Sequence, residues 1–253
     1  MKYSAKFFSD SMPIWKRKKD PLICTLLYRP LSFHLSAICA NRSISANSVS
    51  YFSIVVALFA GLFFLIGTYE CNIVAAILLN FWITLDCVDG NLARSVNKQF
   101  FGEFADAISG YILTSVICFT MGLSTYAVGG IIFSSQNLYV IILSSVAAIS
   151  DPLMRLIYQK FKATLRELQD RGVVINYCDN HQDVNQVSSL LTRLEEVLGF
   201  GGILPMLVLI ATIFNALDVI VIYCFAYYGG ACVVMTIKYI LNAIYYEKNL
   251  SSK

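Results

Sequence analysis

Three aspartates stand within stretches that are otherwise apolar enough to enter a lipid bilayer. Asp86 and Asp89 come near the end of one such stretch, and Asp106 comes near the start of the next. A carboxylate in a membrane helix costs about 2.5–3.5 kcal/mol on insertion scales, so it usually faces a cavity, a partner or an ion. Three carboxylates held close together would repel one another unless a divalent cation binds them. Hard oxygen ligands favour Mg²⁺ or Mn²⁺, and Mg²⁺ usually keeps water and substrate phosphate among its ligands. These residues therefore predict a metal site that acts on a phosphate-bearing substrate.

The spacing of the acids indicates how they would meet. Residues three, four and seven apart share one face of a helix. One face of the first stretch holds Asp86, Asp89, Gly90 and Ala93. One face of the second holds Gly102, Asp106 and Gly110. Two antiparallel helices joined by a short turn near residues 97–101 would bring the acids together beside small residues that leave room. We therefore expect a pocket at this junction.

The composition shows what kind of molecule positions these residues. Of the 253 residues, 57% are hydrophobic and 14% are charged, with a mean hydropathy of +0.66. A soluble chain carries roughly 25% charged residues, so this composition excludes a secreted disulfide scaffold, a coiled coil and a disordered chain. The net charge of +3 is too small to indicate a nucleic-acid partner. The chain is expected to be a membrane protein whose partner is the lipid bilayer.

Stretches free of charged residues mark the membrane spans. A bilayer core of about 30 Å requires about 20 helical residues for each crossing. One stretch, 107–150, is long enough for two crossings, with Gly129, Gly130 and the polar residues 134–137 as the turn between them. The sequence thus predicts an all-α, polytopic protein with six transmembrane helices near residues 48–69, 71–95, 102–127, 137–160, 198–214 and 218–246.

The positions of the basic residues predict the orientation. In this topology all 19 Lys and Arg residues fall on one side, and the turns around Glu70, Ser134 and Asp218 carry none. The positive-inside rule then places both termini in the cytoplasm. The polar and basic first 20 residues do not have the pattern of a cleavable signal peptide. We expect a bacterial inner membrane rather than an endoplasmic reticulum, although both would share this charge pattern.

Two polar regions flank or interrupt the spans of what we expect to be a single domain over residues 1–253. Residues 1–46 form a cytoplasmic or interfacial arm, in which the mixed apolar and basic stretch 21–44 predicts a helix lying in the interface. The cluster Lys16–Lys19 would either attract anionic lipid, at about 1 kcal/mol for each cation, or only set the topology. Residues 161–197 are expected to form a cytoplasmic loop with helical ends. The eight cysteines show no C-x-x-C pair and are interpreted as packing residues.

The residues around the acids resemble the signature of the CDP-alcohol phosphatidyltransferases. That signature reads D-x-x-D-G-x-x-A-R, a spacer usually of eight residues, and G-x-x-x-D-x-x-x-D. The chain reads Asp86-Cys-Val-Asp89-Gly90-Asn-Leu-Ala93-Arg94, then seven residues, then Gly102-Glu-Phe-Ala-Asp106-Ala-Ile-Ser-Gly110. Seven signature positions match, and a chance match at any one starting position is on the order of 10⁻⁹. The stretch 45–50 also resembles the P-N-x-I-T sequence that opens the family's first span, with Ala46 in place of proline.

The resemblance implies the chemistry of the site. One or two divalent ions, Mg²⁺ or Mn²⁺, would be held against the pyrophosphate of a CDP-linked donor by Asp86, Asp89 and Asp106. The nucleotide would approach the backbone closely at Gly90, Ala93 and Gly102. The reaction would move a phosphate-linked group to an acceptor, with release of CMP, in phospholipid or related lipid biosynthesis. A homodimer is compatible with this reading, and a nucleic-acid partner is not expected.

Three cations have less specific expected roles. Arg94 would steady the acids or the phosphates. Arg155 and Lys238 are candidate ligands for an anionic acceptor, although extension toward the membrane surface would also account for both. Asp151, four residues before Arg155, is expected to pair with it.

One departure from the signature concerns the chemistry itself. The fourth aspartate, which in the family lies near the metals and acts as general base, is Gly110 here. A general base contributes about 10²–10⁴-fold in rate, so its loss would slow the reaction of a hydroxyl acceptor without removing the metal site. An acceptor that is already ionised, such as a phosphate or phosphonate, needs no proton removed.

Three functions therefore compete. The favoured one is an active transferase. The second is a catalytically impaired relative that binds metal and a CDP-lipid and acts as a regulator or partner. The third is a six-helix transporter with an accidental motif, but the acids cluster at one junction, whereas a conduction path usually places polar groups near mid-membrane.

Overall fold

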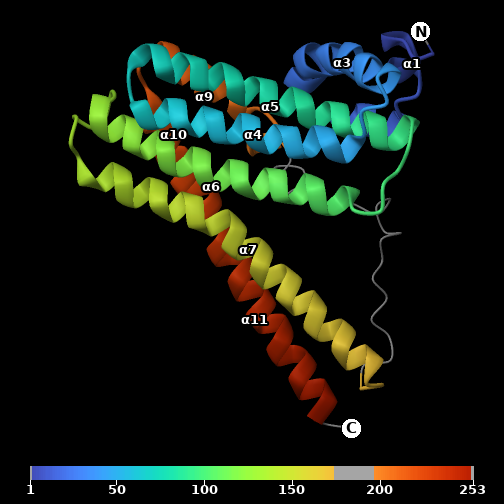
Figure 1. The fold of residues 1–253 in the computed structure, drawn as a ribbon. Helices are drawn as coiled ribbons and strands as arrows, with labels where there is room; N and C mark the ends of the chain where they lie inside the picture. Colours follow the sequence, from blue (N-terminus) through green and yellow to red (C-terminus); the bar gives the residue numbers. More distant parts are fainter. Residues whose placement is uncertain (1, 174–196, 252–253) are drawn as a thin grey trace.

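The computed structural model describes residues 2–173 and 197–251, and these residues form helices joined by turns, with no strand (Figure 1). Within this part of the chain, five helical segments are long and apolar enough to cross a membrane. They are α4 (Ala46–Ile66), α5 (Tyr69–Ser95), α6 (Gly102–Val128), α7 (Leu138–Asp170) and Leu217–Lys248. The last segment is made of α10 (Leu217–Cys224), the π-helical η3 (Phe225–Gly229) and the first part of α11 (Gly230–Ser251). The prediction of an all-helical membrane protein is confirmed.

The expected span at 198–214 differs from the other five. Its helix, α9 (Leu204–Ile213), has ten residues, which rise about 15 Å and cover about half of a bilayer core. Three glycines between residues 199 and 202 precede it, and each costs about 1 kcal/mol in a helix interior. Six complete crossings are therefore not confirmed, since this part of the chain combines a turn with a short apolar helix.

At two of the predicted turns, a glycine ends one helix and a polar side chain caps the start of the next. Gly67, with a φ of 72°, ends α4, and the Thr68 side chain accepts the amide hydrogen of Cys71 to begin α5. Gly129, with a φ of 85°, ends α6, and the Asn137 side chain accepts from Tyr139 at the start of α7. These positive φ values favour glycine. Each turn reverses the chain, so α5 runs antiparallel to α4, and α7 runs antiparallel to α6.

Helices α4, α5 and α6 form the part of the bundle that carries the motif. Ser109 of α6 hydrogen-bonds Ser53 of α4 at 2.6 Å and accepts from the Trp82 indole of α5 at 3.0 Å. At the motif end, the backbone N–H of Asn47 donates to Gln99 Oε1 at 3.0 Å. This bond holds the α5–α6 turn against the start of α4. The motif residues therefore lie on three helices whose relative positions are fixed at two depths.

The N-terminal arm packs at the motif end of this bundle (Figure 1). It contains α1 (Ala5–Asp10), α2 (Ile14–Lys19), the π-helical η1 (Cys24–Tyr28) and α3 (Arg29–Asn41). The helix expected within 21–44 is thus present. The Asn91 side chain of α5 donates to Ser32 and Ser36 of α3, at 3.1 and 3.2 Å, so polar contacts hold the arm to the motif helix.

Helix α7 continues to Asp170, beyond the end expected near residue 160. An aromatic contact with α11 explains the extension: the Phe161 and Tyr239 ring centroids lie 5.1 Å apart. Figure 1 shows α7 and α11 running together away from α4, α5 and α6. The loop expected at 161–197 therefore begins after α7, and residues 174–196, with Cys178 and Arg193, lie outside the described residues. The seven described cysteines are free and at least half-buried.

Candidate active site

The three acids meet at one end of the bundle. Asp86 and Asp89 lie on α5 and Asp106 on α6, and one carboxylate oxygen from each lies within 4.8 Å of the other two. Their exposure differs: Asp89 is buried, Asp86 is half-buried and Asp106 is exposed. The arrangement expected from helical spacing is therefore present.

A residue of α4 orients the buried acid. The Ser50 hydroxyl donates to Asp89 Oδ2 at 2.6 Å. Ser50 is itself buried, one turn into the helix that Ser45 caps. A hydrogen bond to a metal-binding carboxylate fixes its rotamer and is worth about 10–100-fold in metal affinity.

The acids fit a divalent cation. Each Mg²⁺–oxygen bond is about 2.1 Å long, so oxygens on opposite sides of the ion lie about 4.2 Å apart, close to the spread of the three carboxylates. The ligands are hard oxygens alone, which suits Mg²⁺ or Mn²⁺. Small residues next to the acids leave space for further ligands from water or substrate.

A pocket of about 630 Å³ lies on the α4 side of the acids, within the usual volume range of ligand sites. We call it the α4-side pocket. It contains both Asp89 and Asp106, and the three small motif residues expected near a nucleotide also line it, namely Gly90, Ala93 and Gly102. Residues of α4 also line it, namely Ala46, Asn47 and Ser50. The turn between α5 and α6 adds Lys98, Gln99 and Phe100, and α6 adds Glu103.

Asn47 has an unmet hydrogen-bonding group in this pocket. Its Oδ1 is enclosed, and among the described residues it is the buried side-chain atom that lacks a hydrogen-bond partner. Leaving a buried acceptor unpaired costs about 1–3 kcal/mol. A ligand donor in the α4-side pocket would satisfy it. In the sequence, Asn47 is marked only by its position in the stretch 45–50, which resembles the opening of the family's first span.

A second pocket of about 400 Å³ lies on the other side of the acids, between α6, α7 and η3. We call it the α7-side pocket. Asp86 lines this pocket only, whereas Asp106 lines both. Gly110 also lines it, and a Cβ atom added there would meet nothing within 4 Å. The position of the family's fourth acid is therefore open space.

Arg155 brings a positive charge to the α7-side pocket. Its Nε donates to Asp151 Oδ2 at 2.9 Å, and its guanidinium lies 5.1 Å from the centre of the Tyr111 ring. Asp106 and Arg155 both line this pocket. The expected pairing with Asp151 is present. Lys238, by contrast, is exposed on α11 and is not one of the residues that form either pocket.

Arg94 ends the first half of the motif, and its guanidinium is bonded to Asn91 rather than to the carboxylates. Its Nη2 donates to Asn91 Oδ1 at 3.2 Å, and a Cβ added to Gly90 would lie 3.0 Å from its Nη1. A side chain at position 90 would thus press on the guanidinium. This contact explains locally why a glycine precedes the arginine by four residues.

The N-terminal arm supplies charged residues that sequence reasoning missed. Arg29 is 6% exposed, and its Nε donates to Asp20 Oδ2 at 2.6 Å. Burial acts to raise the pKa of Asp20, but Arg29 and Lys16 outweigh it, so the pKa lies below its ordinary value. Arg29 Nη1 also donates to Asn91 Oδ1 at 3.4 Å, two residues after Asp89. These contacts join residues far apart in sequence, so no local spacing could predict them.

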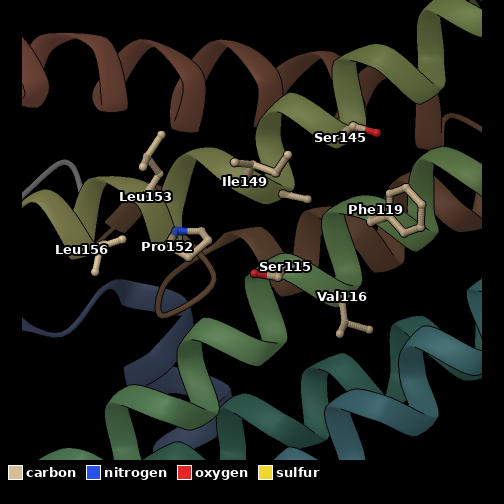
Figure 2. Close-up of a pocket in the computed structure, with 9 residues that line it drawn as sticks. Ser115, Val116, Phe119, Ser145, Ile149, Pro152, Leu153 and Leu156 are labelled. Carbon is tan, nitrogen blue, oxygen red and sulfur yellow. The ribbon is translucent and has the colours of Figure 1, made fainter.

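A third cavity, of about 590 Å³, is an apolar groove between α6 and α7. Figure 2 shows Val116 and Phe119 of α6 on one wall and Ile149, Pro152 and Leu153 of α7 on the other. No ionisable side chain lines it. It is therefore not the site of the chemistry.

Comparison with known proteins agrees with the motif. The family model described as CDP-alcohol phosphatidyltransferase matches residues 43–167. The match includes α4, α5, α6 and most of α7, and with them both pockets' acidic residues. A search of the curated proteins found no match. The resemblance carried by the motif is confirmed.

Proposed function

From the membership of residues 43–167 in the CDP-alcohol phosphatidyltransferase family, we propose that the chain transfers a phosphate-linked group from a CDP-alcohol to an acceptor and releases CMP, with Mg²⁺ or Mn²⁺ as cofactor. The observation that carries this proposal is the convergence of three carboxylates, from two helices, between two pockets. The product would be a phospholipid or a related lipid.

The two pockets would hold the two substrates. The α4-side pocket is the larger, and its small residues leave room for a nucleotide beside the acids. The α7-side pocket carries Arg155, which suits an anionic acceptor. Because Asp106 lines both pockets, a donor phosphate and an acceptor oxygen could approach the same point from opposite sides.

Each residue of the site would have a defined part in the reaction. Asp86, Asp89 and Asp106 would hold the divalent cation, which when bound neutralises charge on the bridging and leaving oxygens as CMP departs. Ser50 would keep Asp89 in its metal-binding rotamer. Gly110 offers no group to take a proton, so the acceptor oxygen that attacks the donor phosphorus would already be ionised. Arg94 would act through Asn91, rather than on the acids directly.

The membrane arrangement that suits this function has both termini in the cytoplasm. In Figure 1 the N- and C-termini lie toward the same end of the helices. Residues 199–203 and α9 together would make the sixth crossing, and the arm would lie in the interface near anionic lipid. We propose a bacterial inner membrane, in which both substrates would be reached from the cytoplasmic face.

The experiment that tests the function is CMP release by the purified chain. We expect release with Mg²⁺ or Mn²⁺ for at least one pair from panels of CDP-linked donors and of anionic and hydroxyl acceptors. Chelation of the metal and the substitution Asp89→Asn should each abolish it, with at least about a hundredfold loss of rate. Release that persists in Asp89→Asn would show that the acid cluster is not the catalytic centre.

Gly110 favours one alternative, a relative that binds without turnover. It would bind metal and CDP-lipid and act on a protein partner. The two functions separate clearly: the alternative predicts that CDP raises the melting temperature while no acceptor supports CMP release.

A further inference from the structure

A buried tyrosine lines the α7-side pocket together with two acids of the motif. This residue, Tyr228, is 6% exposed. Its oxygen accepts the backbone hydrogen of Phe200 at 3.4 Å. Within the described part of the chain, the hydroxyl has no acceptor for its own hydrogen. Because a buried donor without an acceptor is unfavourable, this hydroxyl is suited to donate to a ligand in the pocket.

The backbone and a neighbouring ring fix the position of this hydroxyl. Tyr228 belongs to the π-helical η3, and such turns frequently occur at functional sites. Its ring stacks on that of Phe200, with the two centroids 6.1 Å apart. Phe200 lines the same pocket. The tyrosine ring is therefore held from one side, and its hydroxyl is placed at the pocket without a large choice of rotamers.

Arg155 reaches the same pocket from α7, and its guanidinium is also held in place. Its Nε donates to Asp151 Oδ2 at 2.9 Å, and the Asp151 side chain is 2% exposed, whereas that of Arg155 is 46% exposed. The Tyr111 ring lies 5.1 Å from the guanidinium, close enough for a favourable cation–π contact. The two Nη atoms have no hydrogen-bond partner among the described residues. They form a fork of the kind that binds two oxygens of one phosphate.

We propose that Arg155 and Tyr228 together bind the anionic group of the acceptor, a phosphate or phosphonate, in the α7-side pocket. The proposal rests on the proposed function and identifies Tyr228 as a residue that selects the acceptor. Arg155 supplies hydrogen bonds from α7, Tyr228 supplies one from η3, and Asp151 positions the guanidinium. Asp86 and Asp106 line the same pocket, and the divalent cation would offset their repulsion of the anion.

A competing source of the same chemistry is the donor's pyrophosphate. The two sources are distinguished with inorganic phosphate as the probe for the acceptor group and CDP as the probe for the donor. Phosphate is titrated against the purified full chain in detergent with Mg²⁺, first alone and then with CDP at saturation, and the melting temperature is followed. We expect phosphate to bind in both cases, because the donor and the acceptor group would occupy different pockets.

The variant Tyr228→Phe removes the hydroxyl and keeps the ring that stacks on Phe200, so it should fold. We expect the apparent Kd for phosphate to rise about tenfold, the loss of one hydrogen bond to a charged group, while the Kd for CDP is unchanged. Arg155→Lys keeps the charge but not the fork, and should also weaken phosphate about tenfold. Tyr139→Phe is the matched control, since Tyr139 is 69% exposed at the start of α7 and should change neither Kd.

The binding results decide the proposal independently of turnover. Wild-type affinity for phosphate in Tyr228→Phe overturns the role of the hydroxyl. Wild-type affinity in Arg155→Lys overturns the role of the fork, because charge alone would then suffice. Loss of phosphate binding when CDP is at saturation, or an equal loss of CDP affinity in either variant, overturns the assignment to the acceptor.

Turnover separates this proposal from the proposed function. If phosphate binding depends on both residues yet no substrate pair releases CMP, the proposed function fails while the anion site stands. If CMP is released and the KM of an anionic acceptor is the same in the wild type and in Tyr228→Phe, the function stands and the role of Tyr228 fails.

Discussion

The three carboxylates of the site are held with different firmness. Asp89 is buried and bonded by Ser50, whereas Asp106 is exposed and lines both pockets. The fixed acid would set the position of the cation, and the exposed one would be free to adjust as substrates arrive. The residues that support the acids therefore matter as much as the acids.

Ser50→Ala tests that support. We expect metal affinity to fall about 10–100-fold, because the carboxylate loses the bond that fixes its rotamer. The measurement is the Mn²⁺ concentration that half-maximally raises the melting temperature. Ser53→Ala is the matched control, since its hydroxyl contacts Ser109 and the backbone of Ser50 rather than an acid. Equal metal affinity in wild type and Ser50→Ala would contradict the supporting role.

Asn47→Ala tests whether the enclosed amide oxygen awaits a ligand. The free protein should lose little stability, because Oδ1 has no partner to lose. The apparent Kd for CDP should rise about tenfold, the worth of one hydrogen bond in a closed site. Thermal shift with and without CDP gives both quantities. A large loss of stability without any change in the Kd would mean that the residue is structural.

Gly110→Asp tests the idea of an ionised acceptor. The added side chain has open space, so the melting temperature should stay close to that of the wild type. A new negative charge beside Asp106 should slow turnover of anionic acceptors by about tenfold, by repulsion. Initial rates of CMP release across acceptors provide the measurement. A large gain with every hydroxyl acceptor would instead show that the wild type lacks only a base.

At the scale of elements, the end of the bundle opposite the motif is fastened by one carboxylate. Asp218 is 0% exposed at the start of α10, where it accepts the amide hydrogens of Ile132 and Phe133 and that of Val219. It thereby ties the turn between α6 and α7 to the last span. No cation is needed there, because backbone donors satisfy the charge.

Asp218→Ala should therefore destabilise the protein by about 3 kcal/mol, since three amide groups lose a charged acceptor. Unfolding in detergent with a graded denaturant would measure it. Asp10→Ala, at an exposed position of α1, is the control. Gly130→Ala should also destabilise, because its Cβ would clash with the buried Asp218 carboxyl group. Wild-type stability in Asp218→Ala would show that the turn is held by other contacts.

The elements that the sequence predicts well are those with a local signal. The five long spans follow from charge-free stretches, and the meeting of Asp86, Asp89 and Asp106 follows from helical spacing and one short turn. The shortened α9 was also readable in part, because its three glycines precede it, but hydropathy alone extended it to residue 198. The end of α7 was misplaced because Phe161 is held by Tyr239, a partner supplied by another helix.

The docking of the N-terminal arm could not be predicted either, because its partners lie even farther away in the sequence. The bond between Arg29 and Asn91 spans 62 positions of sequence. Lys16 and Asp20, four apart, indicate only a surface pair on a helix. The contact of Asp20 with the buried Arg29 depends on how the arm folds and docks against α5, which the four-residue spacing does not encode.

At the scale of the whole molecule, the acids lie close to the ends of α5 and α6. Asp89 lies six residues before Ser95, the end of α5, and Asp106 lies four residues after Gly102, the start of α6. At 1.5 Å per residue these positions are about 9 and 6 Å from the helix ends, comparable to the polar layer on one side of a bilayer. Bond exchange would then take place level with the phosphates of neighbouring lipids. CMP could diffuse directly into water while the acyl chains never leave their leaflet, so synthesis on this scaffold would require no lipid to flip.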